Sequence, residues 1–292
     1  MRIRISAHWD TPQNILNRLL MQFKTDDINL TNVEFVFDDS YDIAIFFNYM
    51  NFEVPKNKKA FVLPNEPFWA GSHQKEYRES NCTVLGFCEE GYTGNNIITP
   101  AHTFYGGRGP WVDKLDIWNY SNISNTNFIN KTKGISSCIT DINYSYGLYP
   151  KRVNVLNQLK ESSYIEFFGV GKYKCKHKND SPRKIDCTKN FKFNLSIEND
   201  CRDNWVTEKF FDAILTDCIP IYYGCLNIKE LFPEDGYILL ENIDDMEYVQ
   251  DTLSHINNNM DKIYNQKIEG AKKIKDRYFK DHNLLKKIIG IL

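Results

Sequence analysis

Two adjacent charged residues, Glu208 and Lys209, stand where the sequence predicts the first turn of a helix. The free N–H groups of a helix start and the positive end of its dipole attract anions, and Lys209 adds a full positive charge beside them. A carboxylate such as Glu208 accepts hydrogen bonds from vicinal hydroxyls, as acidic residues do with the ribose of nucleotides. Either residue alone is also common on a solvated helix face. The pair together is typical of a site for a sugar nucleotide.

The segments around this pair predict a βαβ unit. Apolar residues alternate with polar ones over 191–197, which indicates a strand, and a polar loop follows at 198–204. Residues 206–217 carry apolar side chains at helical spacing, and the nearly all-apolar segment 219–223 predicts a second strand that ends at Gly224. Because open α/β sheets bind ligands at the carboxyl ends of parallel strands, we expect the polar loop to contribute to a ligand site.

The order of three motifs in this stretch resembles the signature of the α-1,3-fucosyltransferases. FNLSIEN is followed by WVTEK and then by IPIYYG, all within residues 191–224. Members of that family move L-fucose from GDP-fucose to a saccharide hydroxyl with inversion at the anomeric carbon. The resemblance implies donor-site positions for Asn199, Trp205, Glu208 and Lys209, with Glu208 on the ribose and Lys209 on the diphosphate. Trp205 stands where the family often has Tyr, which preserves stacking and removes a phenolic hydrogen bond.

A further cation for the diphosphate is implied upstream. Arg152, in YPKRVNVLNQL, lies where the resembled family has a diphosphate-binding Arg, with Lys151 beside it as the alternative. A guanidinium can bridge two phosphate oxygens and stabilise a departing GDP. The chain has no DxD triplet, the metal-carrying signature of the other major glycosyltransferase architecture. We therefore expect side chains to neutralise the diphosphate, with no metal site and no cofactor required.

Inversion needs a general base that faces the sugar from the side opposite the leaving group. Glu66, in AFVLPNEPFW, is our candidate, because it follows a buried-looking strand and has Phe68 and Trp69 beside it to reduce its solvation and raise its pKa. The family places Glu before Asn in the corresponding loop, whereas here Asn65 precedes Glu66. The rival carboxylates are Glu89, Glu90, Asp10 and Glu198.

Composition fits a folded enzyme. The 292 residues are 42% hydrophobic and 14% aromatic, which is enough for two packed cores. A net charge of −2 provides no general field for nucleic acid or an anionic membrane. The eight cysteines form no CxxC pair, which favours free thiols in a reducing compartment. The chain enters a strand pattern directly at MRIRISAHWD, without an apolar run that could serve as a signal sequence or anchor, so we expect a soluble, cytoplasmic protein with no membrane span.

Alternating strand and helix patterns predict the α/β class. We expect an acceptor-binding Rossmann-like domain over 1–133 and a GDP-sugar donor domain over 134–292, divided at the end of the Gly-, Asn- and Ser-rich segment 105–133. Two such domains facing a cleft correspond to the GT-B type of the resembled family. A last helix over 283–291 is expected to pack back on the first domain.

Three classes of function stay open. The resemblance favours a fucosyltransferase whose partners are GDP-fucose and an oligosaccharide acceptor, with α-1,3 transfer to N-acetylglucosamine in a glycan. An exostosin-like or other nucleotide-sugar glycosyltransferase with a different donor is the alternative, and titration with GDP, UDP and ADP sugars separates the two. A catalytically silent binding protein is the third, and it would hydrolyse donor only at the background rate.

Overall fold

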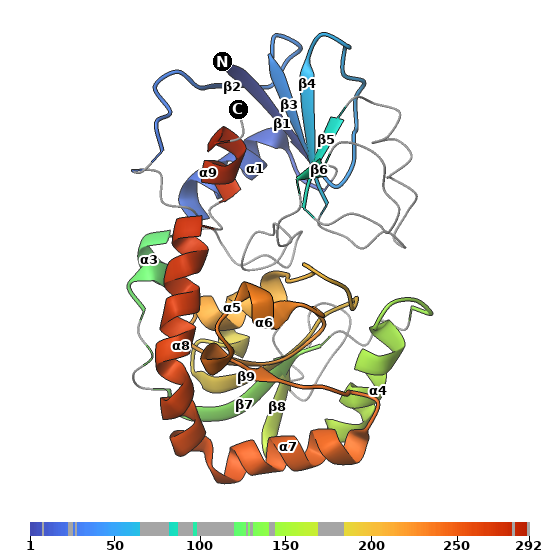
Figure 1. Cartoon of the computed structure of the whole chain (residues 1–292), viewed down its shortest axis with the longest axis vertical. Coiled ribbons are helices and arrows are strands. Elements are labelled where there is room, and N and C mark those ends of the chain that lie inside the picture. The colour runs from blue at the N-terminus through green and yellow to red at the C-terminus, as the bar shows by residue number, and fades with distance from the viewer. Residues whose placement is uncertain are drawn as a thin grey trace. The chain divides into compact units, whose positions relative to one another are not determined.

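The chain forms two compact units, each built on a parallel sheet (Figure 1). Unit 1 comprises Met1–Phe104 and Phe279–Leu292, and unit 2 comprises Tyr105–Tyr278. The predicted α/β class with two sheets is confirmed, and the division by contacts falls before the segment 105–133 instead of after it. The structure, a computed structural model, describes residues 1–7, 9–22, 26, 28–64, 82–86, 96–97, 120–126, 128, 131–139, 144–168, 184–281 and 284–290.

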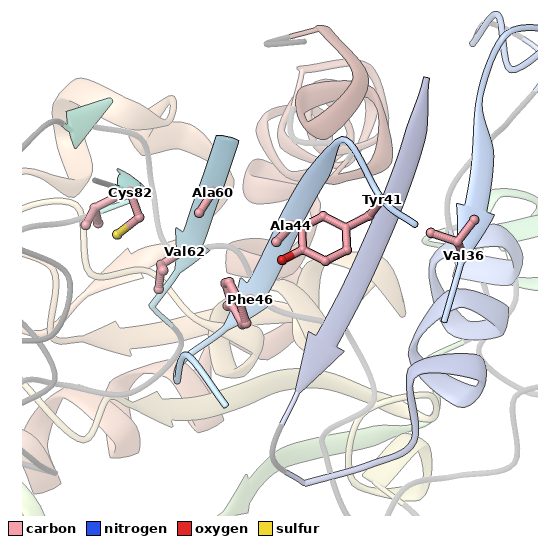
Figure 2. Packing of buried hydrophobic residues seen from close by; sticks show 8 residues of the cluster. Val36, Tyr41, Ala44, Phe46, Ala60, Val62 and Cys82 are labelled. Atoms are coloured by element: carbon pink, nitrogen blue, oxygen red, sulfur yellow. The ribbon is translucent and has the colours of Figure 1, made fainter. Parts of the chain in front are cut away.

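Unit 1 is a sheet of parallel strands in the order β2-β1-β3-β4-β5-β6. Alternate residues of neighbouring strands point to the same face and build one side of its core, as Figure 2 shows for Ala44, Phe46, Ala60 and Val62. The C-terminal helix α9 packs against α1, as the sequence predicted. The elements are β1 (Arg2–Ala7), α1 (Pro12–Gln22), β2 (Glu34–Val36), β3 (Ile43–Phe47), β4 (Lys59–Leu63), β5 (Cys82–Leu85), β6 (Asn96–Ile97) and α9 (Leu284–Gly290).

Unit 2 has the strand order β11-β10-β9-β7-β8, again all parallel. From β7 the chain first adds β8 on one side of β7 and then returns to add β9 on the other side. The chain leaves β7 toward β8 and leaves β9 toward β10, in opposite directions along the sheet, and such a reversal of strand order is where open α/β sheets bind ligands.

The elements of unit 2 match the predicted βαβ unit, with β9, α5 and β10 in the expected places. Longer helices follow and pack around the sheet (Figure 1). The described elements are α3 (Tyr120–Ser124), β7 (Lys133–Cys138), α4 (Tyr149–Leu159), β8 (Ile165–Phe168), η3 (Lys184–Cys187), β9 (Phe191–Ile197), α5 (Glu208–Leu215), β10 (Ile219–Tyr223), α6 (Ile228–Leu231), η4 (Glu234–Gly236), β11 (Ile238–Leu239), α7 (Met246–Asn258) and α8 (Met260–Asp281).

Helix α8 is joined to the rest of unit 2 by buried polar contacts. The Lys275 ammonium lies 2.6 Å from the Asp217 carboxylate, and both side chains are buried. The Tyr264 hydroxyl donates to the backbone carbonyls of Asp217 and Phe128 at 2.9 and 3.1 Å. Within the described part of the chain, we find no helix that combines the length and the apolar character needed to cross a membrane.

Candidate functional site

The loops after β7 and β9 carry the charged residues that the sequence singled out. Arg152 lies in the first turn of α4, which follows β7, and Glu208 and Lys209 open α5, which follows β9. The two loops are joined directly, because the Leu148 amide donates to the Asn199 carbonyl at 2.9 Å. The parallel sheet thus brings both predicted cation positions to the same edge of unit 2.

Glu198, the first residue after β9, is the centre of a buried hydrogen-bond network. Its carboxylate accepts from the Thr207 amide at 2.8 Å, from the Thr207 hydroxyl at 2.6 Å and from the Tyr222 hydroxyl at 3.3 Å. The Lys209 ammonium lies 3.4 Å from the same carboxylate. Burial raises the pKa of Glu198, and the nearby Lys209 charge opposes that rise. Glu198 therefore fixes the turn that leads into α5.

The end of β10 fits around this buried carboxylate only because residue 224 is a glycine. Gly224 has φ +152°, a backbone conformation that side chains with a Cβ rarely adopt. A Cβ added there would lie 2.4 Å from the Glu198 Cβ. The glycine that ends the IPIYYG motif thus makes room for Glu198.

Lys209 is held in place by three acceptors among the described residues and still reaches the surface. Its ammonium donates to the Thr207 hydroxyl at 3.0 Å and to the Glu208 carboxylate at 3.2 Å, besides its contact with Glu198. Thr207 is the N-cap of α5, and its side chain accepts from the Lys209 amide. The side chains of Glu208 and Lys209 are each 18% exposed. A ligand at this helix start would meet a carboxylate and an ammonium side by side.

Arg152 has the opposite environment. Its side chain is 4% exposed, its Nε is buried, and among the described residues that nitrogen has no hydrogen-bond partner. The guanidinium carbon lies 5.3 Å from the centre of the Tyr149 ring. Burial lowers the pKa of Arg152, while the charges of Glu198 and Glu208 raise it. A buried donor without a partner is costly, so this position favours an anionic ligand.

The neighbouring cation, Lys151, is already paired. Its ammonium donates to the Asp244 carboxylate, and this bond raises the pKa of Lys151. Of the two cations that the sequence left open, Arg152 is thus the one whose environment calls for a ligand.

Trp205 and Asn199 form a buried pair. The Trp205 indole N–H donates to the Asn199 side-chain oxygen at 3.1 Å, and the Trp205 side chain has no exposed surface. In this structure the indole holds Asn199 in place and presents no open face on which a ligand could stack. Asn199 in turn accepts the Leu148 amide through its own carbonyl, so the pair joins the loops of β7 and β9.

Of the five candidate bases, the structure describes two, Asp10 and Glu198. Glu66, Glu89 and Glu90 lie outside the described residues, so the assignment of Glu66 stays a prediction. Asp10 accepts from the Thr11 amide and the Asn14 side chain, both at 2.8 Å, at the start of α1. Glu198 is enclosed by the network described above and has no exposed surface.

Two features of the site were not found from the sequence. Tyr222 contributes a hydroxyl to the Glu198 network, although the IPIYY pattern indicated only a buried strand. Tyr144, Tyr146 and Tyr149 form an aromatic cluster just before Arg152. The recurrence of tyrosine so close to a predicted phosphate ligand was a signal that could have pointed to this cluster.

A family model described as "Glycosyltransferase family 10 (fucosyltransferase) C-term" matches residues 128–282, more than half of the chain. The chain belongs to glycosyltransferase family 10. The matched span contains Arg152 and the whole segment from Glu198 to Gly224.

Curated relatives of this family 10 chain are similar over shorter stretches. A fucosyltransferase-like protein of Arabidopsis thaliana is 31% identical over 74 residues, which is 25% of this chain and 14% of that protein. The 4-galactosyl-N-acetylglucosaminide 3-alpha-L-fucosyltransferase 9 of Homo sapiens is 30% identical over 117 residues, which is 39% of this chain and 31% of that enzyme. The matches thus span about a third or less of the length of these relatives.

The fold of the family 10 chain is similar to that of a solved α1,3-fucosyltransferase. The match has a TM-score of 0.58 at 14% identity and covers 93% of this chain and 82% of that one. An α1,3-fucosyltransferase structure with GDP matches with a TM-score of 0.56, and one with GDP-fucose with a TM-score of 0.53, both at 16% identity and over 92% of this chain and 81% of that one. At this level of identity the likeness shows the fold alone.

Proposed function

We propose that this chain transfers L-fucose from GDP-fucose to a saccharide hydroxyl with inversion at the anomeric carbon, in α-1,3 linkage to N-acetylglucosamine of a glycan. The observation that carries the donor assignment is the buried Arg152 guanidinium, whose Nε has no partner among the described residues, beside the strand-order reversal of a family 10 chain. Solved α1,3-fucosyltransferases that match this fold were crystallised with GDP and with GDP-fucose, which supports the same donor.

The diphosphate of the donor would lie between the loops of β7 and β9. Arg152 supplies a guanidinium from α4, and Lys209 supplies an ammonium from the start of α5. Both charges stabilise the negative charge that develops on GDP as it leaves. The Glu208 carboxylate beside Lys209 would accept hydrogen bonds from the ribose hydroxyls. Asn199, held by the Trp205 indole, completes the donor side.

The fixed position of Lys209 supports a catalytic purpose. A lysine side chain loses considerable rotamer entropy when it is held, and here Thr207, Glu208 and Glu198 hold it before any ligand arrives. That entropy is therefore lost on folding and not on binding, so the charge is already in position at the helix start where the departing diphosphate becomes negative.

We further propose that the two cations make a metal cofactor unnecessary, and that Glu66 is the base that removes the proton from the acceptor hydroxyl. The metal proposal predicts unchanged transfer after extensive dialysis against EDTA. The base proposal predicts that Glu66→Gln abolishes transfer and leaves GDP affinity within about twofold, because a base acts on the acceptor and not on the nucleotide. If Glu66→Gln turns over normally, the base is another carboxylate.

The donor proposal is tested by calorimetric titration of the full chain with GDP, UDP and ADP. GDP should bind most tightly, and Arg152→Ala should weaken GDP binding about 10- to 100-fold, the loss expected for charge-assisted hydrogen bonds to a diphosphate. Lys151→Ala is the matched control, because that neighbouring ammonium already bonds to Asp244. The GDP affinity of this variant should stay within about twofold of the wild type. No heat with GDP, or equal losses in the two variants, would refute the donor site.

The acceptor and linkage require a separate experiment. Curated relatives include the fucosyltransferase 9 named above as a 3-alpha-L enzyme and an alpha-(1,4)-fucosyltransferase of Arabidopsis thaliana, 40% identical over 48 residues. A glycan-array assay with GDP-fucose, followed by linkage analysis of the product, decides between these linkages. Fucose found at the 4-hydroxyl would correct the linkage and leave the donor proposal intact.

A further inference from the structure

An exposed aromatic cluster precedes helix α4. The rings of Tyr144 and Tyr146 stack with their centroids 5.0 Å apart and their planes 18° from parallel. Tyr149 meets both rings edge-on, at 5.1 Å from Tyr144 and 6.0 Å from Tyr146. Tyr144 is 45% exposed and Tyr146 is 37% exposed. The two stacked rings thus form one contiguous exposed aromatic patch, which carries more meaning than single exposed side chains scattered over a surface.

The position of the cluster connects it to the donor site. It lies on the segment that follows β7, on the opposite side of the strand-order reversal from Lys209. Leu148, within the cluster's segment, donates to the Asn199 carbonyl, and the Tyr149 ring lies 5.3 Å from the Arg152 guanidinium. The exposed rings and the buried unpartnered Nε therefore belong to the same loop-to-helix junction.

We propose that Tyr144 and Tyr146 form the surface on which the planar base of the donor nucleotide stacks. The inference rests on the proposed donor function and assigns the part of the nucleotide that Arg152, Glu208 and Lys209 do not cover. Every nucleobase has a π-face, and stacking on an aromatic side chain requires no particular hydrogen-bond pattern. Tyrosine offers this area with only two rotatable side-chain bonds, so little entropy is lost when the base binds.

A saccharide ring of the acceptor is the competing occupant of such a surface. The contacts favour the nucleotide, because Tyr149 of the cluster adjoins the cation assigned to the diphosphate, and the neighbouring Leu148 bonds to Asn199 on the donor side. A base attached through ribose to a diphosphate at Arg152 would continue away from the phosphates along this segment. If the base stacks on the rings, the affinity for GDP depends on them. If a saccharide stacks there, the affinity for the acceptor depends on them, and the experiment distinguishes these two results.

The experiment measures the affinity of the full chain for GDP and for inorganic pyrophosphate by calorimetry. Tyr144→Ala combined with Tyr146→Ala should weaken GDP binding about 5- to 100-fold and leave pyrophosphate binding unchanged, because pyrophosphate has no base to stack. Tyr144→Phe combined with Tyr146→Phe is the matched control, which keeps both rings and should keep GDP affinity within about twofold. Circular dichroism and the melting temperature of each variant establish that the exposed substitutions leave the fold intact.

The outcomes separate this inference from the proposed function. If wild-type chain binds GDP, Arg152→Ala weakens GDP and pyrophosphate alike, and the double alanine variant binds GDP normally, the base-stacking proposal is wrong and the donor site stands. If the double alanine variant raises the acceptor KM at unchanged GDP affinity, the rings hold a saccharide and the proposal is again overturned. If the wild-type chain does not bind GDP at all, the proposed function is wrong, and this inference is then wrong as well.

Discussion

The buried ion pair between Lys275 and Asp217 offers a quantitative test of how helix α8 is held in unit 2. The two charged atoms are 2.6 Å apart, with side chains 7% and 1% exposed. The Lys275 ammonium also donates to the Thr126 hydroxyl. Burial lowers the pKa of Lys275, and the Asp217 carboxylate opposes that effect. Replacing Lys275 by Met keeps most of the length and volume of the side chain and removes the terminal charge with its hydrogen bonds.

The expected loss follows from what remains after the substitution. Breaking a buried pair by removing one partner costs about 3 to 5 kcal/mol, because the other charge stays buried without compensation. Lys131 lies close enough to interact with Asp217, so part of the compensation survives and the lower end of that range, about 3 kcal/mol, is expected. For a unit of this size that free energy corresponds to a melting temperature lower by about 6 to 12 °C.

A double substitution separates the charge from the packing. Asp217 has φ +61°, a conformation that Asn also tolerates, so Asp217→Asn removes the charge without straining the backbone. We expect Lys275→Met with Asp217→Asn to be more stable than Lys275→Met alone, because no uncompensated carboxylate is left. Calorimetric melting of the full chain and its three variants gives the coupling energy. A single-variant loss below about 1 kcal/mol, or a double variant no better than the single one, would refute this reasoning.

Two further predictions concern the network around Glu198. Gly224→Ala should destabilise the chain by at least about 2 kcal/mol through backbone strain and the clash with Glu198. Gly290→Ala is the control, because a Cβ there meets no atom of the described residues within 4 Å, and its free energy of unfolding in urea should stay within about 0.5 kcal/mol of wild type. Equal effects of the two substitutions would contradict the clash. Burial raises the pKa of Glu198 above its ordinary value of 4.5. Above pH 4.5 the unfolded chain therefore loses this proton while the folded chain still keeps it, so the contribution of Glu198 to stability decreases as the pH rises. Glu198→Gln removes that dependence. In urea unfolding from about pH 5 to about pH 8, the free energy of unfolding of the variant should therefore rise relative to that of the wild type. A difference between the two free energies that does not change with pH would mean that the pKa is not raised.

The sequence predicted those parts of the site that depend on strand order. Alternating apolar residues identified β9, and helical spacing identified α5, so Glu208 and Lys209 could be placed at a helix start. The family resemblance then brought Arg152 to the same edge of the sheet. Parallel strands align their carboxyl ends, so residues distant in the chain could be placed together without knowledge of side-chain contacts.

The orientation of the polar side chains in the loops could not be predicted from the sequence. Trp205 lies in a polar loop and could have faced a ligand, yet it is buried against Asn199. Glu198 directly follows the end of a strand, and its burial with the Thr207 and Tyr222 contacts shows that it points inward. Period-two alternation applies inside a strand and gives no orientation for the residues that follow it. For that reason the positions were predictable and the roles of these polar residues were not.

The two cations of the proposed donor site are held in different ways, and the proposal predicts a different contribution from each. Lys209 contacts three acceptors among the described residues, so a phosphate must compete with Thr207, Glu208 and Glu198 for it. Arg152 is buried with its Nε unpartnered among the described residues, so a phosphate that reaches it satisfies a donor already removed from water. In the proposed site Arg152 would therefore supply mainly affinity, because binding relieves a cost that folding imposed. Lys209 would supply mainly position, because its neighbours hold the charge at the helix start where the departing diphosphate becomes most negative.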